Sequence, residues 1–154
     1  MKRFFSIFVS FIIICMLAGC DNAKGDNINV STVYSGISPM SDSTLVEMND
    51  SYISNYYGID VSELKEYVFA QSEDPKSAET IIMFKCEDND KRKTYIEAVN
   101  NALKQKYEEL SNYDLPEEAK LVKAARVKTK GNFVYVIISD NASDMNKIVK
   151  DSIS

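Results

Sequence analysis

Histidine and tryptophan are both missing from the 154-residue sequence. Without histidine, the chain cannot form the Ser–His or Cys–His pairs that activate many hydrolytic nucleophiles, and it lacks the imidazole ligands of the usual zinc and copper sites. The lack of tryptophan weakens the case for a module that stacks sugar rings, although nine tyrosines partly substitute for it. These absences argue against the commonest small hydrolases and transition-metal proteins.

Cysteine is scarce as well, and the three examples are Cys15, Cys20 and Cys86. The first two belong to the amino-terminal segment treated below, which leaves Cys86 without a partner for an intrachain disulfide. The folded domain must therefore be stable without a covalent cross-link. In an extended strand Cys86 shares a face with Ile82 and Phe84, so we expect a buried, inert thiol and not a nucleophile.

The first twenty residues, "MKRFFSIFVSFIIICMLAGC", have the layout of a secretory signal peptide. The basic pair Lys2 and Arg3 precedes an apolar run, and small residues follow that run. Only sixteen uncharged residues separate Arg3 from Cys20, which is at or below the lower edge of the roughly 17–25 residues that a membrane span requires. Because the basic residues precede the run, the amino end is expected to stay in the cytoplasm.

The stretch "LAGC", Leu17 to Cys20, resembles a bacterial lipobox. That resemblance implies that residues 1–19 are a lipoprotein signal peptide, cut between Gly19 and Cys20, and that Cys20 is the lipid attachment site. The Cys20 sulfur would carry a diacylglyceryl group whose acyl chains, palmitate for example, anchor the protein at the extracytoplasmic face of the cell membrane. The alternatives are a cleaved, soluble secreted protein and an uncleaved anchor.

Acidic side chains outnumber basic ones in the chain that such cleavage would leave. Losing residues 1–19 removes Lys2 and Arg3 from the 18 basic residues and none of the 23 acidic ones, which gives a side-chain net charge of −7. Nucleic acid is therefore not an expected partner, because phosphate binding needs clustered Lys and Arg. Steering by anionic lipid is not expected either. Attachment should come from the acyl chains, in which each buried methylene contributes about 0.8 kcal/mol.

Composition divides the mature chain into a tether and one domain. Residues 20–42 are rich in Asn, Ser, Asp and Gly, and we expect them to form a lipidated tether, with a possible short strand within residues 28–37. Residues 43–154 are expected to fold as a single domain. About 110 residues are enough to bury one core and too few for two.

A helix is predicted at the start of this domain, over residues 43–58. Its apolar face would carry Leu45, Met48, Tyr52 and Tyr56, at spacings of 3, 4 and 4. Gly58 would end the helix. The pattern assigns Tyr56 to the core and leaves Tyr57 as a plausible surface contact.

The rest of the chain alternates between strands and helices. Strands are predicted at 66–72 and 79–86, a long amphipathic helix at 89–113, a turn capped by Asp114 at 114–117, and two strands at 120–129 and 132–139 around the turn Lys130–Gly131. Met145, Ile148 and Val149 give the last segment a helical face. We expect an α+β fold with a mainly antiparallel sheet of about four strands and helices packed on one face.

Four segments carry a resemblance to a known family: "YGIDVSELKEYVF", "AETIIMFKCED", "LPEEAKLVKAARV" and "GNFVYVIISDN". Together with the long charged helix, they are similar to a family of small lipoproteins of Gram-positive anaerobic bacteria, known only as a domain of unknown function. The resemblance covers roughly residues 45–150 and the lipobox. It implies the domain boundaries and the location of the protein, and it supplies neither catalytic residues nor an activity.

Two acidic runs and two acidic pairs are candidate sites. "CEDND" at 86–90 and "SDNASD" at 139–144 lack the spacing of an EF-hand loop, and we expect both to be helix starts, where the helix dipole favours acids. Glu108–Glu109 and Glu117–Glu118 have the residue type of a glycosidase pair but are expected on solvated helix faces. No motif singles out a Ser–Lys dyad.

The sequence therefore assigns no catalytic residue, no metal ligand and no cofactor. We expect a lipid-anchored extracytoplasmic protein that acts as a non-catalytic binding module of the cell envelope. Its expected partners are the membrane, through Cys20, and an envelope protein. One alternative is an accessory lipoprotein that binds a small ligand, and another is a small envelope enzyme that works without histidine.

Overall fold

The computed structural model describes residues 27–154. The predicted signal peptide, its cleavage site and Cys20 lie outside the described residues. The helices are α2 (Val30–Ile37), α3 (Asp50–Tyr52), α4 (Asn89–Asn112), α5 (Pro116–Ala124) and α6 (Ala142–Ser152), and the short helical turns are η1 (Ser38–Met40), η2 (Ile53–Tyr57) and η3 (Val61–Glu63). The strands are β1 (Leu45–Glu47), β2 (Glu66–Ser72), β3 (Thr80–Lys85), β4 (Lys128–Lys130) and β5 (Phe133–Ile138).

The strands of residues 27–154 form one sheet in the order β1-β2-β3-β5-β4, and every neighbouring pair is antiparallel. This confirms the α+β class and the antiparallel sheet, with five strands where about four were expected. β3 and β5 lie in the interior of the sheet, and all of their residues are buried. The central position predicted for residues 133–138 from their apolar character is therefore confirmed.

The additional strand, β1, occupies the first part of the segment predicted to be helical. Residues 45–47 pair with the end of β2 and extend the sheet by one edge strand. The helix starts only after Asn49, whose side chain accepts a hydrogen bond of 2.8 Å from the Tyr52 backbone N–H. It ends at Gly58 as predicted, in a left-handed conformation with φ of 68° that suits glycine. Sheet pairing has overridden the helical spacing of residues 45 and 48.

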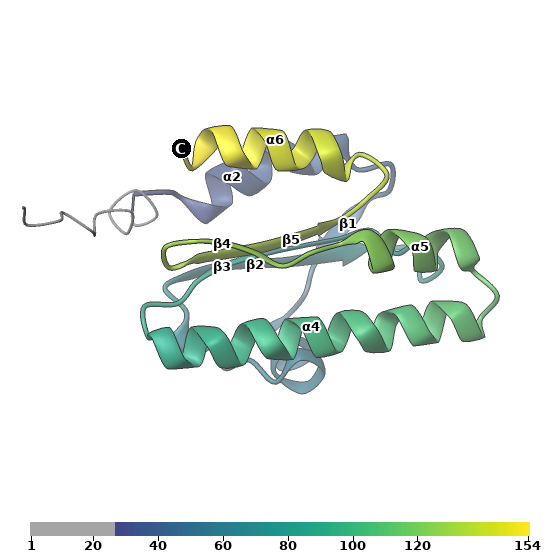
Figure 1. Ribbon diagram of the computed structural model, residues 1–154, viewed down its shortest axis with the longest axis horizontal. Helices are drawn as coiled ribbons and strands as arrows, with labels where there is room; N and C mark the ends of the chain where they lie inside the picture. Colours follow the sequence, from purple (N-terminus) through teal and green to yellow (C-terminus); the bar gives the residue numbers. More distant parts are fainter. Residues whose placement is uncertain (1–26) are drawn as a thin grey trace, which may run out of the picture.

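Helices cover both faces of the sheet, so the expectation that they pack on one face is wrong. Figure 1 shows α2 and α6 above the sheet, α4 below it, and α5 beside one end of the sheet, over the last turns of α4. Two apolar clusters fill the two interfaces, one with Met83 and Tyr135 beneath α2 and α6, the other with Phe84 and Val136 against α4. Because β3 and β5 present apolar side chains on both sides, each side needs its own cover.

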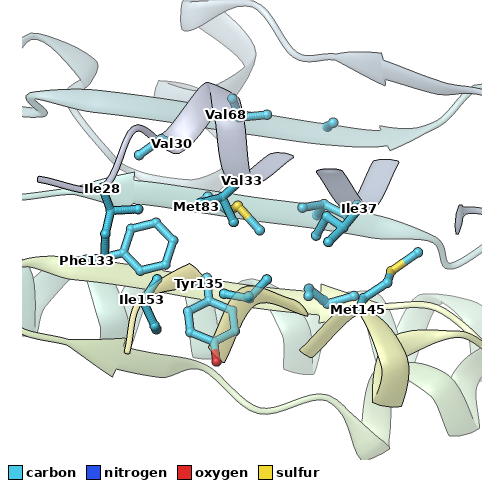
Figure 2. Close-up of a cluster of buried hydrophobic side chains, with 14 residues drawn as sticks. Ile28, Val30, Val33, Ile37, Val68, Met83, Phe133, Tyr135, Met145 and Ile153 are labelled. Carbon is cyan, nitrogen blue, oxygen red and sulfur yellow. The ribbon is translucent and has the colours of Figure 1, made fainter. Parts of the chain in front are cut away.

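On the face covered by α2 and α6, helix α2 comes from the segment predicted to be a tether. Residues 27–42 belong to the folded domain, so the predicted boundary at residue 43 is wrong. Ile28, Val30, Val33 and Ile37 are all buried in the cluster beneath α2 and α6 (Figure 2). Asn29 caps α2 by accepting the Thr32 backbone N–H at 2.8 Å. Val30, Val33 and Ile37 form the buried face of a helix, where a short strand within residues 28–37 was considered.

The buried Glu79 carboxylate binds residues 42 and 43, which connect the α2 region to β1. Glu79 is 5% exposed and accepts hydrogen bonds from the backbone N–H of Ser43 at 2.8 Å, the N–H of Asp42 at 3.2 Å and the Ser139 hydroxyl at 2.8 Å. The Ser43 hydroxyl is a further donor. Burial alone would raise the pKa of Glu79, but these hydrogen bonds outweigh it and hold the pKa below its usual value.

The region after α4 also differs from its prediction. Residues 116–124 form helix α5, and only residues 128–130 are a strand, where a strand over 120–129 was expected. Leu115 precedes the helix without a side-chain cap, and Asp114 instead adopts a φ of 58°. Ala119 and Val122 pack against Leu110 of α4 in a third apolar cluster. That contact with α4 explains why this segment is helical.

Candidate functional site

A cleft of about 230 Å³ opens on the sheet face covered by α4, among η2, the β2–β3 turn and the last turns of α4. We call it the tyrosine cleft, and its aromatic side chains are Tyr52, Tyr56, Tyr57 and Tyr113. Its charged side chains are Asp74, Lys106 and Glu109. The last turns of α4 lie at the end of the molecule opposite the start of α2 and the carboxyl terminus (Figure 1).

Three of the tyrosines form one wall. The rings of Tyr52 and Tyr56 are stacked, with centroids 5.4 Å apart and an interplanar angle of 15°. Tyr57 contacts Tyr56 edge to face at 5.0 Å and continues into the core against Phe69 at 5.3 Å. The buried Tyr57 ring therefore supports the two outer rings, Tyr52 and Tyr56, which line the cleft.

The predicted roles of Tyr56 and Tyr57 are reversed in the structure. Tyr57 is buried at 7% exposure, whereas Tyr56 is half-buried and lines the cleft. The buried face already lies one residue later at the start of this turn, where Ile53 is fully buried and Tyr52 is 37% exposed, and Tyr57 follows Ile53 by four residues on the same helical face. Burial, with a smaller effect from the Glu109 carboxylate, raises the pKa of Tyr56 to about 12, so its hydroxyl stays a proton donor at neutral pH.

Lys106 supplies the cationic group of the cleft. Its Nζ donates a hydrogen bond of 2.9 Å to the Thr80 hydroxyl, which in turn donates to the Ala78 carbonyl at 3.0 Å. Burial lowers the pKa of Lys106 to about 8, although the nearby Glu109 and Glu118 carboxylates oppose that shift. The amine is therefore close to its titration point in mildly alkaline solution.

The Thr80–Lys106 pair does not form a catalytic dyad. The two side chains are within hydrogen-bond distance, as a nucleophile and its base must be. However, Thr80 is only 1% exposed and does not line the tyrosine cleft. Its hydroxyl is committed to the Ala78 carbonyl, so a substrate has no access to it.

The rim of the cleft is acidic and partly preorganised. Asp74 accepts the Lys76 backbone N–H at 2.9 Å, and its own N–H donates to the Ser72 hydroxyl at 3.0 Å, so hydrogen bonds fix the β2–β3 turn. Glu109 accepts from the Gln105 side chain at 3.0 Å along α4. Tyr113 closes α4 and is 77% exposed, which leaves a large amphipathic ring free to contact a partner.

The structure places Cys86 and the two acidic runs as the sequence predicted. Cys86 is fully buried and joins the apolar cluster under α4, as predicted, and burial raises the pKa of its thiol. Asp88 caps α4 by accepting the backbone N–H groups of Asp90 and Lys91, both at 2.9 Å, which confirms that "CEDND" starts a helix. The run "SDNASD" likewise leads into α6, with Asn141 at its start.

The four residues of the two acidic pairs have different surroundings. Glu117 bonds Lys120 at 2.6 Å on the surface of α5, and Glu118 accepts the Ala78 backbone N–H at 2.5 Å. Glu109 alone lines the tyrosine cleft, while Glu108 is exposed on α4. Across residues 27–154, no group of three or more acids and cysteines is arranged to hold a metal ion.

Sequence reasoning missed Asp74, Lys106 and Tyr113 as members of the cleft. Lys106 lies on α4, whose apolar spacing was the signal used, and that signal reports only the buried face. Tyr113 follows the last turn of the helix and is too exposed to enter such a pattern. The one signal in the sequence for an aromatic site was the group of tyrosines at 52, 56 and 57. Nothing in the sequence links that group to Lys106 and Tyr113, about fifty residues later.

The fold defines a class of protein: an antiparallel sheet between two helical layers, with an aromatic cleft at one end. The family model described as a domain of unknown function, DUF4358, matches residues 38–139, and the chain belongs to that family. The match begins where α2 ends and stops before α6, so the two helices of one layer lie outside it. Comparisons with curated proteins and with solved structures find no match.

Proposed function

We propose that this protein is a bacterial lipoprotein, anchored through Cys20 to the extracytoplasmic face of the cell membrane, and that it is a non-catalytic binding module of the cell envelope. The tyrosine cleft is its binding site. The lipobox pattern at residues 17–20 supports the anchor. The observation that carries the binding role is the wall formed by Tyr52 and Tyr56, backed by Tyr57 and flanked by exposed Tyr113.

The size of the cleft favours one projecting group of a larger partner over a whole small molecule. Its volume of about 230 Å³ lies below the roughly 300–1,000 Å³ of pockets that enclose drug-sized ligands. Tyrosine is among the residues most enriched at protein interfaces and their energetic centres. A partner side chain or ring inserted between the Tyr52–Tyr56 wall and Tyr113 would stack on the tyrosine rings. It would also meet a cationic donor, Lys106, and the anionic acceptors Asp74 and Glu109.

The chemistry of the cleft supports a non-catalytic role. Its amine, Lys106, hydrogen-bonds a buried threonine and is not paired with an accessible nucleophile. Its acids, Asp74 and Glu109, are engaged in hydrogen bonds that stabilise local structure. None of the described helices, all within residues 27–154, is long and apolar enough to cross a membrane, and the proposed attachment relies on the lipid alone.

Two experiments in cells test the proposal. Metabolic labelling with a clickable fatty acid should mark the wild-type chain and not Cys20→Ser, and label that persists in the variant contradicts the anchor. For the cleft, a photo-crosslinking amino acid replaces Tyr113, and a control carries it at Ile148, an exposed apolar residue on the other helical layer. We expect an adduct from position 113 that disappears with Tyr52→Ala. Identical adducts from both positions contradict the assignment of the cleft.

A further inference from the structure

The two carboxylates that line the tyrosine cleft keep capacity for further hydrogen bonds. Asp74 accepts one hydrogen bond, from the Lys76 backbone N–H at 2.9 Å, and Glu109 accepts one, from the Gln105 side chain at 3.0 Å. A carboxylate has two oxygens and about four acceptor positions. Within residues 27–154, neither group forms an ion pair. Both carboxylates can therefore accept bonds from a cation that enters the cleft.

Lys106 is the one basic residue among those that line the cleft, and its amine is bonded towards the interior of the domain. Its Nζ donates to the Thr80 hydroxyl at 2.9 Å, and Thr80 is 1% exposed and does not line the cleft. With all three groups ionised, one ammonium opposes the two carboxylates, and the charge of the cleft is 1 − 2 = −1. The cleft therefore favours a cationic occupant over an anionic one.

The carboxyl end of α4 adds to this preference. Glu109 and Leu110 in the last turns of α4 line the cleft, as does Tyr113 at the end of the helix. A helix carries a partial negative charge at its carboxyl end, and a cation placed there is stabilised. The last turn of α4 contains no basic residue. The helix thus leaves this favourable position for a cation to a group from another molecule.

The tyrosines favour a flat cation over a compact one. The stacked rings of Tyr52 and Tyr56 and the exposed ring of Tyr113 line the cleft. An arginine guanidinium is planar, stacks on aromatic faces, and has N–H groups that donate to carboxylates. A lysine ammonium is a compact charge that is more strongly hydrated, so it loses more on leaving water. A cleft of about 230 Å³ has room for one such side chain.

We propose that the tyrosine cleft binds an arginine side chain of the partner protein, with the guanidinium stacked on the tyrosines and with Asp74 and Glu109 as its counter-charges. The inference rests on the proposed function, which makes this cleft the binding site, and it adds the chemistry of the partner. A basic partner also complements the protein as a whole, because acidic side chains outnumber basic ones. Such long-range attraction speeds the encounter of two proteins.

The test is a titration of residues 20–154, isotope-labelled for nuclear magnetic resonance, with N-acetyl-arginine amide. N-acetyl-citrulline amide has nearly the same shape without the charge, and N-acetyl-lysine amide has the charge without the planar group. The backbone amide signals of Tyr52, Glu109 and Tyr113 report binding. We expect a saturable response to the arginine probe, with an affinity about tenfold or more above that of the citrulline probe, as the loss of one hydrogen bond to a charged group implies. The lysine probe should bind more weakly than the arginine probe.

Matched variants separate the cleft from general charge. Asp74→Asn/Glu109→Gln removes two charges and keeps the oxygens that accept the existing bonds, and it should lower the affinity for the arginine probe to that for the citrulline probe. Glu97→Gln/Glu108→Gln removes two charges from exposed positions of α4 outside the cleft and should leave that affinity unchanged. Equal affinities for the arginine probe and either other probe overturn the proposal. So does the absence of a saturable response.

The crosslink from position 113 in cells separates this inference from the proposed function. If the adduct forms equally with and without Asp74→Asn/Glu109→Gln, the cleft still binds a partner, and the arginine is overturned. If the purified chain selects the arginine probe but no adduct forms in cells, the preference of the cleft is supported and the proposed partner is contradicted.

Discussion

The Glu66 carboxylate accepts a hydrogen bond of 2.8 Å from the backbone N–H of Val30, the first residue of α2. Its other oxygen lies 3.1 Å from the ammonium of Lys85, a β3 side chain that is 1% exposed. One carboxylate thus joins the first helix to the sheet and faces a buried cation. A carboxylate at a helix amino terminus is also favoured by the helix dipole.

Replacing Glu66 should loosen α2 from the sheet. Glu66→Ala removes the acceptor of the Val30 N–H and a carboxylate that faces a buried ammonium, and we expect a loss of about 2–3 kcal/mol of unfolding free energy. Urea denaturation measures it, with Glu97→Ala on the exposed face of α4 as the control. A midpoint equal to that of wild type would show that this contact does not hold α2.

The domain should lose stability in acid through the carboxylates of buried Glu79 and partly buried Glu66. The pKa values of Glu79 and Glu66 are held below 4.5 in the folded state by hydrogen bonds that outweigh the effect of burial. The stability that these groups contribute is present above an unfolded-state pKa of about 4.5 and is lost as pH falls through the lower folded values.

Glu79→Gln should therefore flatten the dependence of stability on pH between about 5 and 3, besides lowering stability at pH 7. Glu73→Gln, at an exposed position, is the control, because the bond from Glu73 to residues 42–44 is made by its backbone N–H, which donates to the Thr44 carbonyl and is kept in the variant. Denaturant titrations at several pH values give the slope, which reports the difference in bound protons between the unfolded and folded states. An unchanged slope in Glu79→Gln would contradict a lowered pKa at this residue.

A chain that begins at Ser43 should not fold. It lacks Ile28, Val30, Val33 and Ile37, and each buried aliphatic side chain contributes about 1.5–3 kcal/mol. Their sum, roughly 6–12 kcal/mol, is comparable to the whole stability of a small domain. Circular dichroism and thermal unfolding should show a cooperative transition for residues 27–154 and none for residues 43–154. Equal transitions for both would mean that α2 is dispensable.

Cys86 should react slowly with a thiol reagent in the native protein and rapidly in denaturant. Its side chain is buried beside Ile82 and Phe84, and burial raises the pKa of its thiol, so little thiolate is present or accessible. The test uses Cys20→Ser, in which Cys86 is the remaining thiol of the mature chain. Rapid labelling without denaturant would place Cys86 at an accessible, reactive site.

Lys106 should titrate well below other lysines. With a pKa of about 8, roughly a tenth of its amine is neutral at pH 7, and half is neutral at pH 8. The pH dependence of acetylation, followed by mass spectrometry, should have its midpoint near 8 for Lys106, well below the value of about 10.4 for an ordinary lysine side chain. A midpoint at that ordinary value would show that Lys106 is not desolvated in the tyrosine cleft.

Local sequence patterns were sufficient to predict the strands and the helix that depend on interactions within a single element. Residues 66–72, 89–112 and 133–138 formed the strand, helix and strand that their periodicity predicted. The burial of Cys86 followed from strand alternation, and the cap at Asp88 followed from the chemistry of helix starts. In each of these cases the controlling interactions lie within a few residues, or within one face of one element.

Tertiary contacts decided the remainder. Residues 30–37 are a core helix because their apolar side chains pack on the second face of the sheet and the Glu66 carboxylate accepts the Val30 N–H. No local sequence pattern reveals either contact. Residues 45–47 became a strand because β2 had a free edge, and the helical segment after them buries Ile53 and Tyr57 in place of Tyr52 and Tyr56. The tyrosine cleft joins segments far apart in the chain. Single-sequence periodicity reports which side of an element is buried, whereas the partners that bury it, and the exposed side chains brought together as a result, are fixed only by packing.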